Sequence, residues 1–309
     1  MTSNLLDPSI PQARSARWQF WHQREPEQYM GYLFALPAVL IIVVFRLYPL
    51  VSGAQYSLTD WNGIGEAHYI GLDNYERLLH DQVFRDTMLN ALKLIVTLPI
   101  WVIFPMVLAI LIHQGVPGGG FFRAAYFFPA VLSSVIIGSI FNLFLRYDGS
   151  FNNMLGHLGI PAVDWLSDSK IALFTVIAVE IWATFGINVL IFLSGLSTVP
   201  DELIDAAKVD GANLFQTVVR VIIPVLRPIT EFVSVATIIG MLTSMFGLIY
   251  VMTSGGPGTA TYLPEYLIWF QQGRLNEPAY AAATSMVLFV FMSIVALFEI
   301  RLMSRGSDM

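Results

Sequence analysis

Six long apolar runs limit what this chain can fold into. They occupy approximately residues 31–53, 88–112, 122–145, 171–196, 229–252 and 279–303. A helix needs about 20 apolar residues to cross the hydrocarbon core of a bilayer, and each run is long enough to do so with some tilt. Only 12% of the residues are charged, whereas soluble domains carry about 25%. Because the runs do not alternate as barrel strands do, we predict an all-α, polytopic membrane protein with six transmembrane helices.

Basic residues predict which way these helices cross the membrane. Six spans place both termini on one side, and that side carries nine Lys and Arg residues against five on the other. Loops rich in Lys and Arg remain in the cytoplasm, so we predict that both termini are cytoplasmic. The expected plan is a cytoplasmic or interfacial segment at 1–30, a transmembrane domain at 31–303 in contact with membrane lipid, and a cytoplasmic tail at 304–309.

The composition argues against several kinds of chemistry. The chain has no cysteine, and its five histidines are scattered, so we predict no metal site. A net charge of -6 gives no reason to expect nucleic acid as a partner. No GxxxxGK[ST] stretch is present, so we predict no nucleotide bound by this chain. We predict neither catalytic residues nor a bound cofactor.

The loop at 197–228, between the fourth and fifth runs, contains a polar segment with helical patterning. Pro200 and the acidic residues after it indicate a helix start, because acidic groups favour the positive end of the helix dipole. Asp210 and Gly211 indicate a turn, since glycine accepts positive φ without steric cost. Apolar residues then recur at three- and four-residue spacing, which predicts a second helix, and we expect Pro224 and Pro228 to end it and to bend the chain into the fifth run. The 197–228 loop is therefore predicted to be a cytoplasmic helix-turn-helix.

Small side chains make this helical pair suitable for docking. Ala206, Ala207 and Ala212 would let a short helix enter a groove on another protein. Asp205 beside them would fix its orientation by pairing with a basic group. The alternative is an ordinary amphipathic segment that lies on the membrane surface.

The same segment resembles the EAA loop of permease subunits from bacterial ATP-binding cassette importers. Asp205-Ala206-Ala207, Gly211 and Val221-Ile222-Ile223-Pro224 fall at the family's spacings. The chain differs from the pattern in having Asp for Glu, Val for Ile and Ile for Leu. Under this resemblance, the residues that couple the permease to an ATPase are Asp205, Ala206, Ala207, Asp210, Gly211, Ala212, Phe215 and Pro224.

Other segments resemble the carbohydrate branch of that family. They are residues 57–61 and 69–75, the pair Phe122-Arg123 followed by Phe128-Pro129, and residues 253–257 with Thr261. The resemblance covers residues 30–303. It implies a second, homologous permease subunit, two ATPase subunits that hold ATP and Mg²⁺, an external solute-binding protein and a carbohydrate-type substrate. It also implies the bacterial cytoplasmic membrane as the location.

Polar residues in the fourth and fifth runs are candidates for the substrate path. Glu180, Thr184 and Asn188 are spaced by four residues and share one face of a helix. Polar groups at this depth face a cavity or a partner, although Thr and Asn also join packed helices. The fifth run adds Thr237, Met241 and Met245, where the resemblance implies substrate contacts, although methionines at helical spacing are more often packing.

Two other classes of protein remain as alternatives. An ion-coupled secondary transporter would work without an ATPase, but six spans are few for two repeats in one chain. A membrane enzyme would need convergent catalytic groups, whereas the His and acidic residues here are dispersed. The binding protein would meet external segments such as residues 60–62, 73–77 and the turn near Gly255.

Overall fold

The structure is a computed structural model that describes residues 26–114 and 119–304. The chain divides into two units, Met1–Ser52 and Gly53–Met309. Most of the segment predicted to be interfacial, and nearly all of the predicted tail, lie outside the described residues. The described residues of both units are overwhelmingly helical, which confirms the predicted all-α class.

The first unit is helical from Pro26 onward. It comprises α1 (Pro26–Ile42), a π-helical turn η1 (Val43–Leu47) and the first part of α2 (Tyr48–Tyr56). Pro49 has no N–H to donate to the carbonyl of Phe45, its usual partner in an α-helix. Within η1 the N–H of Tyr48 donates to the carbonyl of Val43, so the helix passes this point through one widened turn.

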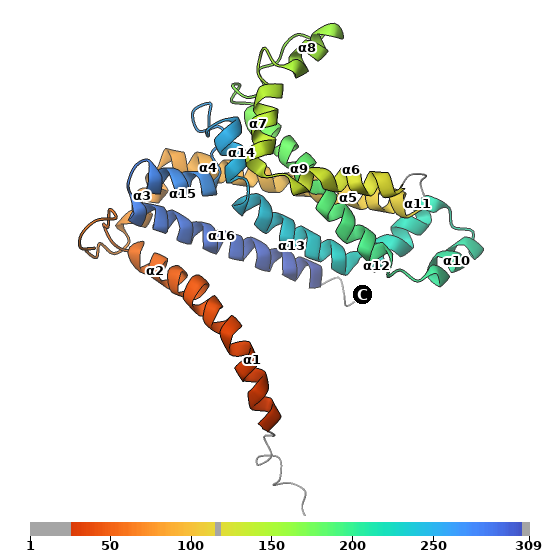
Figure 1. Cartoon of the computed structure of the whole chain (residues 1–309), viewed down its shortest axis with the longest axis horizontal. Coiled ribbons are helices and arrows are strands. Elements are labelled where there is room, and N and C mark those ends of the chain that lie inside the picture. Colours follow the sequence, from red (N-terminus) through yellow and green to blue (C-terminus); the bar gives the residue numbers. More distant parts are fainter. Residues whose placement is uncertain (1–25, 115–118, 305–309) are drawn as a thin grey trace, which may run out of the picture. The chain divides into compact units, whose positions relative to one another are not determined.

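The second unit holds the remaining helices (Figure 1). They are α3 (Asp73–His80), α4 (Gln82–Val96), α5 (Leu98–His113), α6 (Gly119–Val131), α7 (Ser134–Phe144), α8 (Ser150–His157), α9 (Ala172–Leu196), α10 (Asp201–Val209), α11 (Leu214–Thr217), η2 (Val218–Ile222), α12 (Ile223–Val225), α13 (Arg227–Thr243), α14 (Phe246–Met252), α15 (Pro264–Gly273) and α16 (Pro278–Ser304). The strand-like pairing of the described residues is a single isolated bridge between Thr59 and Tyr69.

Four helical stretches are long and apolar enough to cross a membrane: 31–56, 82–113, 172–196 and 278–301. Two further candidates are bent pairs, so the described residues provide up to six spans. The third predicted run is one of these pairs, because α6 and α7 meet at 101°. Ser133, between them, has extended backbone, and its hydroxyl accepts a hydrogen bond from the N–H of Val135. The side chain thus starts a new helix instead of continuing the old one.

The fifth predicted run also departs from a straight helix. We expected residues 229–252 to be continuous, but α13 ends at Thr243 and α14 starts at Phe246. The α14 helix packs on α7, where Asn142 Nδ2 donates to the carbonyl of Met252 at 2.8 Å. Gly138 makes room for this contact, since a Cβ there would lie 3.2 Å from the side chain of Val251. Hydropathy alone did not reveal the break.

Helix α9 is central to the second unit and packs against both α5 and α6 (Figure 1). Its buried residues include Val176, Val189 and Phe192, all at most 1% exposed. Gly186 permits the approach of α6, because a Cβ at this position would overlap the backbone carbonyl of Tyr126. The path of α9 fixes where its polar residues lie.

Candidate functional site

A cavity of about 280 Å³ lies among α5, α9 and α13. Five of the six residues predicted for the substrate path line it, namely Glu180, Thr184, Asn188, Thr237 and Met241. Because α9 is a regular helix, its polar residues, which are spaced by four, lie on one face of it. The structure thus brings together polar groups from two predicted runs.

Asn188 joins the three helices that form this cavity. Its Nδ2 donates to the carbonyl of Trp101 on α5 at 3.2 Å and lies 3.4 Å from Thr237 Oγ1 on α13. The indole N–H of Trp101 donates to Thr97 Oγ1 at 3.0 Å. Asn188 therefore makes the interhelical contacts that the sequence left open as an alternative to a substrate role.

Glu180 differs from Asn188 in having no protein partner for its side chain. Only 7% of the residue is exposed, and it lines the cavity. Among the described residues, none donates a hydrogen bond to its carboxyl group and no cation pairs with it. The hydroxyl of Thr184 donates to the backbone carbonyl of Glu180, at 2.8 Å, and not to its carboxyl group. The carboxyl group is therefore available to water, to a ligand or to another subunit.

Met245 does not join the cavity. It is 1% exposed and packs in the apolar core with Leu242 and Leu248. The reason is the break after α13, which ends the helical spacing that would have aligned Met245 with Met241. Seven further lining residues were not among the predicted path residues, and they include the aromatic side chains of Trp101 and Phe232.

The 197–228 loop contains the predicted helix-turn-helix. The first helix, α10, begins directly after Pro200, and Gly211 has a φ of +77° in the turn. Asn213 and Gln216 then form a reciprocal capping box at the start of α11, with bonds of 2.9 and 2.8 Å. These local contacts give the pair a defined shape.

The second helix ends and the chain bends between Pro224 and Pro228, as predicted, although Pro224 itself lies within the helix. The helical course runs from Leu214 to Val225, and α13 then starts at Arg227 after a bend of 69°. Pro224 lacks the N–H that would reach the carbonyl of Arg220. The π-helical turn η2 lies directly before it, so the widened turn absorbs the missing bond, as at Pro49.

The loop is exposed on one side and anchored on the other. Val209 is 88% exposed and Phe215 is 75% exposed. Asp205 is exposed as well, and its carboxylate pairs with Lys208 Nζ at 2.9 Å. By contrast, Ile222 and Leu226 are at most 4% exposed. They belong to an apolar cluster that also contains Ile112 of α5, Phe192 and Leu196 of α9, and Val233 of α13.

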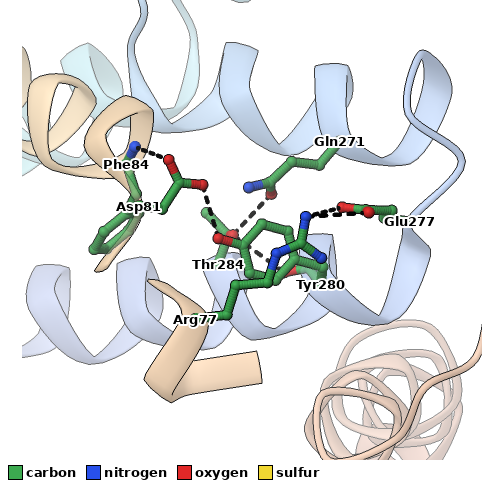
Figure 2. A network of polar contacts seen from close by, with 7 residues as sticks. All are labelled: Arg77, Asp81, Phe84, Gln271, Glu277, Tyr280 and Thr284. Atoms are coloured by element: carbon green, nitrogen blue, oxygen red, sulfur yellow. Dashed lines mark hydrogen bonds and ion pairs between the residues drawn. The ribbon is translucent and has the colours of Figure 1, made fainter. Parts of the chain in front are cut away.

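A polar network holds the opposite end of the second unit (Figures 1 and 2). Arg77 donates from Nη2 to both carboxylate oxygens of Glu277, at 3.1 and 2.9 Å, and its guanidinium lies 4.0 Å from the ring centroid of Tyr280. The hydroxyl of Tyr280 donates to Asp81 Oδ2 at 2.8 Å. The other oxygen of Asp81 accepts the N–H of Phe84 at the start of α4. The network thus joins α3 and α4 to α16.

Two further polar side chains fasten this end. Asn90 of α4 donates from Nδ2 to the carbonyls of Thr259, Ala260 and Tyr262, each at 3.1 Å. The hydroxyl of Thr284 donates to Gln271 Oε1 at 2.7 Å, which joins α16 to α15 (Figure 2). Sequence reasoning missed these contacts, because the partners lie far apart in the chain.

The comparisons with known proteins agree with one another. Residues 77–302 match the family described as binding-protein-dependent transport system inner membrane component. The chain is 35% identical over 284 residues to the arabinooligosaccharides transport system permease protein AraP of Bacillus subtilis, covering 88% of this chain and 87% of that protein. It is 30% identical over 282 residues to the multiple sugar-binding transport system permease protein MsmF of Streptococcus mutans, covering 90% and 96%.

A solved structure is similar over most of the chain. A bacterial ABC transporter involved in the import of the acidic polysaccharide alginate superposes with a TM-score of 0.80, at 21% identity, over 90% of this chain and 96% of that one. At this identity the likeness concerns the fold. The family match and the apolar helices make this chain a multi-pass membrane protein. The chain belongs to the family of binding-protein-dependent transport system inner membrane components.

Proposed function

We propose that this chain is the permease subunit of an ATP-driven importer that moves a sugar or sugar derivative across the bacterial cytoplasmic membrane. The relatives named for sugar and arabinooligosaccharide transport support the cargo class. The observation that carries the proposal is the continuous packing from an exposed helical pair to the walls of a cavity lined by Glu180, Thr184 and Asn188. In this arrangement both termini and the 197–228 loop face the cytoplasm.

The exposed side of the 197–228 loop docks on the ATPase subunits. Apolar side chains such as Val209 and Phe215, left exposed on a short helical pair, gain by burial in a groove on another protein. Asp205 lies on the same loop, and on docking its carboxylate leaves Lys208 and pairs with a basic group of the partner. The two ATPase subunits bind ATP and Mg²⁺ and supply the energy.

Movement of the loop reaches the cavity through the apolar cluster beneath it. Ile222 and Leu226 pack with residues of α5, α9 and α13, and the same three helices surround the cavity. Packed interiors transmit displacement because they contain few voids. Closure of the ATPases therefore shifts the cavity walls and alternates access between the two sides of the membrane.

A second, homologous permease subunit completes the pathway. Phe232, on the wall of the cavity, is 61% exposed, so this wall extends to the surface of the chain. The cavity is also at the small end of ligand sites, which have volumes of about 300–1,000 Å³. The partner subunit covers this side, and an external binding protein delivers the substrate to the end held by the network of Figure 2.

The test uses the complete importer in proteoliposomes, with residues 205–211 replaced by a Gly-Ser linker of equal length. We expect the variant to lose the ATPase subunits on purification and to lose ATP-dependent uptake. As the matched control, the same replacement at the exposed residues 62–67 should keep the ATPase subunits bound. An ion gradient that drives uptake by this chain without any ATPase would favour the secondary transporter instead.

A further inference from the structure

The Glu180 carboxyl group is the feature of the cavity that most restricts what can bind there. It lies within α9 and is 7% exposed, without a protein partner among the described residues. An unpaired carboxyl group inside a membrane is unfavourable unless water or a ligand satisfies it. Because Glu180 lines the cavity, the group that satisfies it enters from there.

The other polar groups around the cavity are uncharged. Thr184, Asn188, Thr237 and Ser244 supply hydroxyl and amide groups, and Trp101 and Phe232 supply aromatic surface. No Lys, Arg or His is among the described residues that line it. An anionic ligand would therefore meet no basic side chain among the described residues on the cavity walls.

This environment suits a neutral carbohydrate better than an acidic one. Sugar hydroxyls both donate and accept hydrogen bonds, so they satisfy a buried carboxyl group without adding a charge. A uronate or a sugar phosphate would place a negative charge in a poorly screened site that offers no cation among its described lining residues. The fold does not decide the matter, because the structurally similar alginate importer is involved in the import of an acidic polysaccharide.

We propose that Glu180 is a specificity residue that forms hydrogen bonds with the hydroxyls of a neutral carbohydrate, in a cavity whose described lining offers no basic group to an anionic sugar. The inference rests on the proposed function, since it assumes that the cavity of α5, α9 and α13 forms part of the transport path. It assigns the charge class of the cargo and the side chain that selects it.

The first experiment measures ATP-dependent uptake by the complete importer in proteoliposomes, with its own binding protein. The probes are maltotriose and arabinotriose as neutral sugars, trigalacturonate as an anionic sugar and chitosan trimer as a cationic one. We expect uptake of a neutral probe only. Uptake of trigalacturonate, or a preference for the chitosan trimer, would overturn the assignment while leaving an ATP-driven importer intact. Absence of uptake for all of these probes, and for a panel of other sugars, would count against the proposed function itself.

The second experiment changes the side chain. Glu180→Gln keeps the size of the group but replaces the carboxyl group with an amide, and we expect the KM for the transported neutral sugar to rise about tenfold or more. Glu180→Asp keeps the carboxyl group and should recover part of that loss, which a merely structural role would not predict.

Glu299 provides the matched control. It is also a buried carboxyl group, at 9% exposure, on a long apolar helix, but it does not line the cavity. Glu299→Gln should leave the KM within about twofold of the wild-type value. If Glu180→Gln transports as the wild type does, or if both variants raise the KM equally, Glu180 is not the specificity residue.

Discussion

Gly186 sets the distance between α6 and α9. A side chain there would overlap the backbone carbonyl of Tyr126, so Gly186→Leu forces the two helices apart. We expect the free energy of unfolding to fall by about 1–3 kcal/mol, as overpacking usually does. The apparent melting temperature in detergent measures this change. Gly156→Ala is the control, because a Cβ at Gly156 meets no atom within 4 Å and should leave the melting temperature unchanged.

Reversing the charge of Asp205 tests whether the 197–228 loop docks on the ATPase. It is exposed and contacts Lys208 within its own helix, so Asp205→Arg should not disturb the fold. We expect the variant to remain in the membrane but to retain less ATPase and to transport more slowly, because the basic partner now meets a like charge. Co-purification and uptake assays measure both effects. Asp148→Arg, also at an exposed aspartate, is the control, and normal transport by Asp205→Arg would argue against docking through this residue.

At the scale of elements, the network around Arg77 fastens α3 to α16. Arg77→Ala removes both the ion pair with Glu277 and the contact with the Tyr280 ring, whereas Glu277→Ala removes only the first. Exposed ion pairs and cation–π contacts each contribute about 0.5–1 kcal/mol. We therefore expect Arg77→Ala to lower the apparent melting temperature more than Glu277→Ala.

A double-mutant cycle separates these contributions. Arg77 and Glu277 should show a coupling of about 0.5 kcal/mol or more that disappears at high salt. The contact with Tyr280 should survive high salt better, since the ring carries no net charge. Equal effects of the two single variants under all conditions would show that the ring contact contributes nothing.

The sequence predicted elements where local pattern decides and missed those that depend on packing. Helix α9 matches the run 171–196 because an unbroken apolar segment determines it. The turn at Gly211 was also accessible, since Asp-Gly is a local signal. The breaks at Ser133 and after Thr243 could not be predicted, because the runs that contain them are apolar enough to form straight spans. The π-helical turn before Pro224 depends on how the chain passes a proline, which hydropathy does not measure.

At the scale of the whole molecule, the absence of cysteine permits a direct test of topology. Val209→Cys and Ile64→Cys place single thiols at positions that are 88% and 81% exposed. We expect a membrane-impermeant maleimide to label Ile64→Cys in spheroplasts and to label Val209→Cys only after the membrane is broken. The reverse pattern would contradict the proposed orientation and the docking of the 197–228 loop.

Part of the cavity lining could be predicted from the sequence, because it comes from a single helix. Glu180, Thr184 and Asn188 lie on one helix, so their spacing was enough to place them on one face. Trp101 and Ser244 come from elsewhere in the fold, and the rotation of each segment toward the cavity follows from its neighbours. A single sequence contains no direct record of that rotation.

The two ends of the second unit are fastened by different forces. At one end, Arg77, Asp81 and Asn90 make directional bonds that a rotation of a few degrees would weaken. At the other, Ile222 and Leu226 are seated by aliphatic contact, which has no preferred direction. If the 197–228 loop docks as proposed, we expect a push on it to tilt the helices of the second unit about their hydrogen-bonded ends, which keep their places.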